Sequence, residues 1–214
     1  MRGLARAWLS EGIHTSITNG YATLVEIKAG MTSGMGTSQD AVIERVVTAV
    51  SRSIDKHCRR WFYGISGTRY YTPIDSRVID IHDLGTSGSL TITTDEDGDR
   101  TYETSWASTE YDLWPYNDAP YVEVHVTPQG SNAWPVGVAK SVKIAGVFGY
   151  QSGTSASAPM DVREACIIQS TRIFHRKDNP YGVAGNAEMG QLLQIATLDP
   201  DVKLMLEPYR KRAG

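Results

Sequence analysis

Apolar residues recur at helical spacing near both ends of this 214-residue chain and alternate with polar residues through its middle. The longest helical pattern has one apolar face, made of Ile43, Val46, Val47, Val50, Ile54 and Cys58. It predicts a helix that begins with Ser38 as N-cap and ends at the Arg59-Arg60 pair. A shorter helix opens at Thr23-Leu24-Val25-Glu26, which fits a capping box.

Between Gly64 and Tyr150 the pattern changes to short alternating segments, which predict about six strands. An acidic turn at 95–99, with Gly98 at its tip, predicts a hairpin. We therefore expect a small antiparallel sheet or sandwich. The predicted strands cover residues 69–72, 77–81, 90–93, 101–104, 121–126 and 141–150.

Helical spacing returns at Asp161 and continues to near Lys177. Asp199-Pro200-Asp201 then supplies an N-cap, a proline at the first helical position and an acid in the first turn. This predicts a last short helix from Pro200 towards Glu207, which Pro208 ends. The face of the third helix that we expect to be buried holds Val162, Ala165, Cys166, Gln169 and Ile173.

The order of these elements predicts an α+β fold, in which a small helical bundle carries a large antiparallel β insert between its second and third main helices. We expect a flexible N-terminal arm at 1–20 and a helical core built from 21–63 and 159–207. The inserted β domain covers 64–150, and an extended basic tail covers 208–214.

Charge is distributed unevenly along the chain, whose formal net charge is −3. From Gly64 to Tyr150, five basic residues stand against twelve acidic ones, a net charge of −7 that leaves +4 for the rest. Contacts to DNA phosphates need clustered Lys and Arg. The composition therefore argues against the β insert as a DNA-binding surface.

Motifs for catalysis or metal binding are not evident. Cys58 and Cys166 do not make a disulfide framework and are predicted to be buried free thiols. The run Asp95-x-Asp97-x-Asp99 departs from a calcium loop, because Arg100 and Trp106 stand where Gly and Glu are needed. The histidines form no pair at ligand spacing, and no nucleophile or nucleotide-binding motif occurs. We predict no catalytic, metal-binding or cofactor-binding residues, and a protein that is not an enzyme.

Aromatic residues gather in the second half of the β insert. Such residues suit a carbohydrate-binding platform, but they equally suit the packing of a small β core. The cluster holds Trp106, Tyr111, Trp114, Tyr116, Tyr121 and Trp134.

Five segments together resemble the head–tail connector (adaptor) proteins of long-tailed bacteriophages, and the resemblance covers roughly residues 21–212. The segments are 21–28; 49–63; 95–103 with Trp114-Pro115-Tyr116-Asn117; 159–176 with Asn179-Pro180-Tyr181-Gly182; and 198–202 running on to 207–210.

The resemblance implies a structural virion protein, made in the host bacterial cytoplasm, in a ring of about twelve copies beneath the portal. Such a ring extends the DNA channel without sequence-specific DNA binding or membrane contact, and it docks a stopper or tail component. The family's C-terminal helix and tail typically reach into the portal. Two alternatives stay open: a β-insert module that binds a glycan or host protein, and a stopper-level connector ring. The residues that correspond to the portal-binding segment are Leu206, Glu207, Pro208, Tyr209, Arg210, Lys211 and Arg212.

Overall fold

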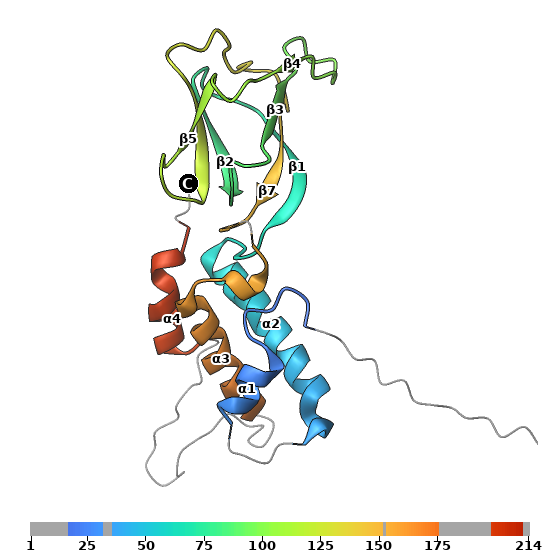
Figure 1. Cartoon of the computed structure of the whole chain (residues 1–214), viewed down its shortest axis with the longest axis vertical. Helices are drawn as coiled ribbons and strands as arrows, with labels where there is room; N and C mark the ends of the chain where they lie inside the picture. Colours follow the sequence, from blue (N-terminus) through green and yellow to red (C-terminus); the bar gives the residue numbers. More distant parts are fainter. Residues whose placement is uncertain (1–16, 32–35, 152, 176–197, 212–214) are drawn as a thin grey trace, which may run out of the picture.

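The computed structural model describes residues 17–31, 36–151, 153–175 and 198–211. They form two parts along one long axis, with helices at one end and a sheet at the other (Figure 1). We call the helices α1, α2, α3 and α4 the helical body, and the strands β1 to β7 the β-module. All seven strands lie between α2 and α3 in the chain. The predicted α+β fold, with an antiparallel β insert between these helices, is confirmed.

The two N-terminal helices begin in different ways. Helix α1 (Leu24–Ala29) starts with the predicted capping box, in which Thr23 and Glu26 bond reciprocally. Helix α2 (Asp40–Cys58) follows a 3-10 turn at Thr37–Gln39, and the side chain of its N-cap residue, Gln39, makes no capping hydrogen bond. The predicted N-cap role of Ser38 is therefore wrong, because the 3-10 turn itself supplies an acceptor for the first amide of α2.

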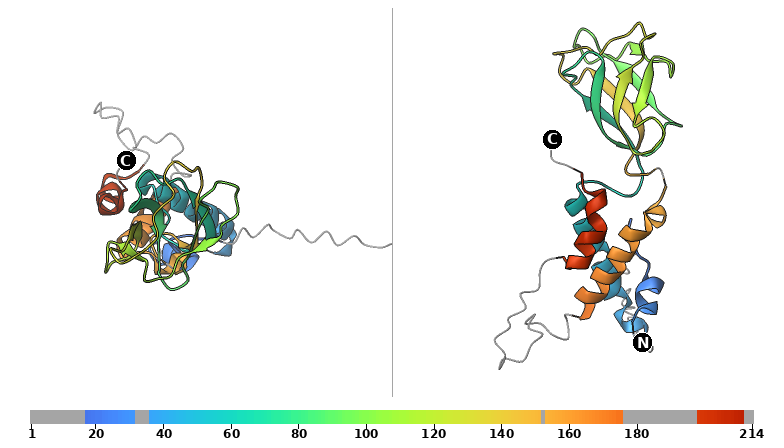
Figure 2. Two further views of the ribbon diagram at one scale, coloured as in Figure 1. Left: turned by 90° about the horizontal axis from the view of Figure 1, so that it is seen from above. Right: turned by 90° about the vertical axis from the view of Figure 1, so that its left-hand side faces the viewer.

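Helices α3 (Met160–His175) and α4 (Pro200–Leu206) complete the helical body. Asp199 caps α4 as predicted, and its side chain accepts from the amide of Asp201. The predicted end of α3 near Lys177 lies outside the described residues. Figure 2 shows α2, α3 and α4 packed side by side. Among the described residues, no helix combines the length and apolar character needed to span a bilayer.

The helical core joins both ends of the chain. The predicted apolar face of α2 is buried against α3 and α4, and Ile17 also packs there, before the predicted start of order at Tyr21. Both cysteines are buried free thiols, as predicted, and burial raises the pKa of Cys58 to about 12. The fully buried residues of this core include Ile27, Val47, Ile54, Phe62, Val162, Cys166, Val202 and Leu206.

The strands form one antiparallel sheet in the order β4-β3-β7-β2-β6-β5, and β1 pairs with β7. Strand β1 runs along the whole of one edge of β7, from Ile65 opposite Phe148 to Tyr71 opposite Val142. The other edge of β7 is shared by β3 and the end of β2. The strands are β1 (Ile65–Tyr71), β2 (Val78–Leu84), β3 (Thr91–Thr94), β4 (Thr104–Ser105), β5 (Tyr111–Trp114), β6 (Tyr121–Val126) and β7 (Val142–Phe148).

Strand β5 was not predicted, although it pairs with β6 from Tyr111 opposite Val126 to Trp114 opposite Glu123. It is a four-residue edge strand with only half-buried and exposed side chains, so its apolar signal is weak. Conversely, the predicted strand at 101–104 contributes only Thr104 to a ladder, because the turn before it extends further. The β-module has its own core, formed by Ile79, Ile81, Leu84, Ile92, Trp106, Val124, Val126, Trp134, Val142, Ile144 and Phe148.

Candidate functional site

Two connecting segments run side by side between the helical body and the β-module. Residues 59–64 leave α2, and residues 149–151 and 153–154 lead back towards α3. The amide of Gly64 donates to the carbonyl oxygen of Gly153 at 2.8 Å. The amide of Tyr150 donates to the carbonyl oxygen of Trp61 at 2.7 Å. The two connecting segments, which we call the joint, are therefore joined to each other by backbone hydrogen bonds and are not independent linkers.

Gly149 makes this close approach possible. Its φ of +143° favours glycine, and its amide donates to the carbonyl oxygen of Asp83 at 2.7 Å. A Cβ atom at this position would lie only 2.1 Å from the carbonyl oxygen of Tyr63. The returning chain passes so close to the outgoing one that no larger residue fits.

An aromatic cluster fills the helical side of the joint. Phe62 is fully buried, with ring centroids 5.6 Å from Tyr21, 5.4 Å from Tyr150 and 5.7 Å from Tyr209. The hydroxyl of Tyr209 also donates to the Asp161 carboxylate at 3.0 Å. Burial, together with the neighbouring Asp161 carboxylate, raises the pKa of Tyr209 to about 12. Through Tyr209, the C-terminal segment becomes part of the joint.

The segment with the implied portal role begins inside the core and ends at the joint. Leu206 is buried, and Pro208 lies in a 3-10 turn at Glu207–Tyr209. The predicted extension from Pro208 is therefore wrong for this stretch, since proline fits the first turn of a helix and Tyr209 gains aromatic contacts. Glu207, Pro208 and Arg210 are exposed, whereas Arg212 lies outside the described residues.

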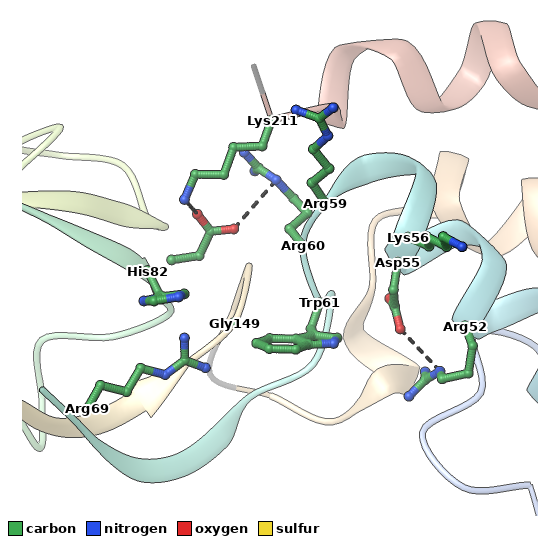
Figure 3. A pocket seen from close by; sticks show the side chains of 11 residues that line it. Arg52, Asp55, Lys56, Arg59, Arg60, Trp61, Arg69, His82, Gly149 and Lys211 are labelled. Carbon is green, nitrogen blue, oxygen red and sulfur yellow. Dashed lines mark hydrogen bonds and ion pairs between the residues drawn. The ribbon is translucent and has the colours of Figure 1, made fainter. Parts of the chain in front are cut away.

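A cleft of about 370 Å³ opens at the joint, and we call it the junction cleft (Figure 3). Six cationic side chains line it, against two carboxylates. The lining comes from the last two turns of α2, the connection after it, strands β1 and β2, and the C-terminal segment. Its residues are Arg52, Asp55, Lys56, Arg59, Arg60, Trp61, Arg69, His82, Asp83, Gly149 and Lys211.

Asp83 ties three segments together on one wall of this cleft. Its carboxylate is buried and lies 2.9 Å from the Lys211 ammonium and 3.5 Å from the Arg60 guanidinium. The amide of Lys211 also donates to the carbonyl oxygen of Cys58 at 2.9 Å. Lys211 therefore links the end of the described chain both to α2 and to the β-module. A buried carboxylate with two cationic partners is costly to disrupt from either side.

Asp55 is the second carboxylate of the cleft. It pairs with Arg52 at 3.1 Å and accepts a short hydrogen bond from the hydroxyl of Tyr21. Burial raises the pKa of Asp55 to about 6, although the Tyr21 hydrogen bond and the Arg52 charge oppose the rise. Burial, reinforced by Asp55, also raises the pKa of Tyr21. Asp55 thus ties Tyr21, in the segment before α1, to α2.

Three cations of the cleft have no carboxylate partner among the residues that the structure describes: Lys56, Arg59 and Arg69. Lys56 and Arg59 are exposed. The Arg69 guanidinium lies over the rings of Trp61 (5.3 Å) and Phe148 (4.4 Å), as Figure 3 shows for Trp61. Burial and the Arg69 and Lys211 charges lower the pKa of His82, so it adds no positive charge at neutral pH.

Sequence reasoning missed the junction cleft because its residues are far apart in the chain. Arg59 and Arg60 were noted as favourable charges at a helix end, and Lys211 as part of the segment with the implied portal role, whereas Arg69 and Asp83 carried no signal. The pairing of β1 and β2 with β7 places Arg69 and Asp83 at the cleft, and ion pairs with Asp83 add Arg60 and Lys211. The one signal in the sequence that pointed towards a cationic site was the net positive charge of the chain outside the β insert.

The aromatic cluster of the β-module separates into buried and exposed members. Trp106 and Trp134 are buried and stacked, with ring centroids 4.0 Å apart, so they pack the core. Trp114 and Tyr116 are 42 % and 56 % exposed and meet edge to face. Trp114 also stacks on His125, which pairs with Glu123 at 2.7 Å. Packing explains the first pair, and only the second lies open to a partner.

The acidic hairpin uses its carboxylates to hold its own backbone. Asp95 is buried and accepts from the amides of Gly98 (2.7 Å) and Arg100 (2.9 Å). Asp99 accepts from the amide of Thr101 at 2.6 Å. These bonds to loop amides explain why aspartates stand at alternate positions.

The chain matches no protein-family profile and no curated protein sequence. Its fold is similar to chains in three solved structures, each match covering 94 % of both chains. One is the neck of an empty GTA particle computed with C6 symmetry (TM-score 0.58, 13 % identity). The others are the virion of the native gene transfer agent (GTA) particle (0.56, 14 %) and the neck of the native GTA particle computed with C12 symmetry (0.53, 14 %).

Proposed function

We propose that this protein is a structural component of the neck of a phage-like particle. In this role it acts as a head–tail adaptor in a ring beneath the portal. The observation that carries the proposal is the structural similarity over 94 % of both chains to chains from the necks of GTA particles. The similarity includes both the helical body and the β-module, which is more specific than a shared helical bundle.

The symmetry of those neck structures supports a ring. They were computed with C6 and C12 symmetry, and identical subunits around one axis contact their neighbours through two different faces. We therefore propose about twelve copies around a channel that the packaged DNA traverses, with a stopper or tail component on the far side. Its role is to connect and position these parts, not to catalyse a reaction.

The exposed residues of the C-terminal segment are the proposed portal contact. Glu207, Pro208 and Arg210 lie at the surface, whereas Leu206, Tyr209 and Lys211 are held by the protein itself. Among the described residues, Arg210 forms one ion pair, a long one with Glu207 (3.8 Å), so its charge stays available to a partner. The exposed members of the segment would then meet the portal while the others anchor it.

Co-expression with the portal protein of the same particle tests the neck role. We expect the two proteins to co-purify and electron micrographs to show an added ring on the portal. A protein that never binds the portal would contradict the adaptor role, and binding only to an adaptor-loaded portal would favour a stopper-level ring.

Arg210→Glu tests the contact itself, with Arg77→Glu in the β-module as a control of equal charge change. We expect about tenfold weaker portal binding for Arg210→Glu alone, equivalent to about 1.4 kcal/mol. Equal binding by the two variants would remove Arg210 from the contact. Deletion of 208–214 is a poorer test, because it also removes the packing of Tyr209.

A further inference from the structure

The junction cleft carries more positive charge than the structure itself uses. Asp55 and Asp83 engage Arg52, Arg60 and Lys211, which leaves Lys56, Arg59 and Arg69 without a carboxylate partner among the described residues. Unpaired like charges that lie close together repel one another, and this repulsion destabilises the folded protein unless an anion binds between them. The surplus therefore indicates an anion from outside the chain.

Arg69 is the best-positioned of the three. Its guanidinium lies over the rings of Trp61 and Phe148, which restricts the side chain without occupying its N–H groups. No described residue accepts a hydrogen bond from those N–H groups. A planar guanidinium held in place with its donors free is well suited to the oxygen atoms of a phosphate group.

Lys56 and Arg59 extend the positive charge along α2. They are three positions apart, so they lie on one helix face with a rise of about 4.5 Å between them. Arg59 then turns the chain, with a φ of +56° at the C-cap. Figure 3 shows that Lys56, Arg59 and Arg69 are spread around the cleft and do not converge on one point.

We propose that the junction cleft binds the phosphate backbone of double-stranded DNA without reading its sequence. The proposal rests on the neck function, which places a duplex next to the ring. Lys and Arg charges that are spread over a cleft suit the repeating phosphates of a strand, whereas a single carboxylate would need cations that converge on one point. The cleft is too small to enclose a duplex, so it contacts phosphates along one strand.

Fluorescence anisotropy with a labelled 20-base-pair duplex of arbitrary sequence measures this contact. With three phosphate contacts, the slope of log K against log salt should be about −2.7, a loss of roughly 40-fold in affinity between 50 and 200 mM salt. A second duplex of different sequence should bind equally well. No duplex binding at 50 mM salt would overturn the proposal.

Lys56→Glu/Arg59→Glu is the main variant, and Arg77→Glu/Lys203→Glu is its control of equal charge change outside the cleft. We expect at least tenfold weaker duplex binding and a slope near −1 for the first, with a much smaller effect for the control. Arg69→Gln, which leaves α2 intact, should weaken binding in the same direction. Equal losses in the cleft and control variants would refute a localised site.

Competition with polyglutamate of similar charge tests whether the ligand of the cleft is DNA or an acidic peptide. If polyglutamate displaces the duplex at equal charge concentration, the ligand is an acidic peptide and the proposal is wrong. Portal co-purification of the same variants keeps the two proposals apart. A protein that fails to bind portal but shows the predicted loss of DNA binding in cleft variants would contradict the neck role alone.

Discussion

The helical body and the β-module draw their cores from the chain in different ways. The core of the β-module comes from one continuous stretch, between Ile79 and Phe148. The core of the helical body combines residues from 21–63 with residues from 158–206, on both sides of the insert. The β-module can therefore complete its core from its own residues. The helical body cannot complete its core until α3 and α4, which follow the insert in the chain, pack against α2. We expect the two parts to respond differently to damage.

Val50→Asp should have the largest effect and break only the helical body. Val50 is 2 % exposed in the core between α2 and α3, and an unpaired charge buried there costs about 4 kcal/mol or more. We expect loss of helical circular dichroism while the tryptophan near-ultraviolet signal from stacked Trp106 and Trp134 persists.

Val25→Asp is the matched control for this experiment, since Val25 is 76 % exposed on α1. It should unfold at the wild-type temperature. If Val50→Asp removes the tryptophan signal as well, the β-module depends on the helical body and the comparison fails.

Gly149→Ala should disturb the joint that links the two parts. The new Cβ would meet the Tyr63 carbonyl oxygen, and the residue would keep an unfavourable φ, so we expect a loss of about 3 kcal/mol. Gly67→Ala in β1 is the control, because a Cβ there meets nothing within 4 Å. Chemical denaturation of both variants measures the difference, and similar stabilities would show that the joint is more adaptable than its geometry indicates.

Asp55 should make stability of the helical body depend on pH. Its folded-state pKa of about 6 lies above the ordinary value of 3.8, so the native state binds the proton more tightly than the unfolded state. Its contribution is therefore most favourable below pH 4 and is lost as the pH rises through 6, a change of about 2 to 3 kcal/mol. Asp55→Asn, which cannot ionise, should lack this component. Unfolding free energies that change in parallel from pH 4 to 7 in the two proteins would contradict the assignment.

Calcium should have the smallest effect, because the acidic hairpin of the β-module is held by its own amides. Asp95 already accepts from Gly98 and Arg100, so its carboxylate is engaged without an ion. We expect millimolar calcium and a chelator to leave the melting temperature unchanged. A rise of several degrees in micromolar calcium would show that the hairpin binds metal.

Local patterns were enough to predict most helices of this protein. The stripe from Ile43 to Cys58, the Thr23–Glu26 capping box and the Asp199 cap act within a few residues, so they can be read without the fold. The β insert was visible as a change of period. Its edge strand β5 escaped notice, because an edge strand with half its side chains in water has a weak apolar pattern.

The sequence by itself determined the order of the helices and the place of the β insert between them, the faces of the helices that are buried and the unequal charge of the two parts. Only the tertiary structure decided which charges meet. Register and packing bring Arg69 of β1, Asp83 of β2 and Lys211 near the C-terminus to one cleft, although they are separated by as many as 142 positions. It also turned the C-terminal segment back onto Phe62 and Asp83 instead of leaving it extended. Long-range contacts of this kind depend on the three-dimensional position of whole elements, which no local spacing encodes.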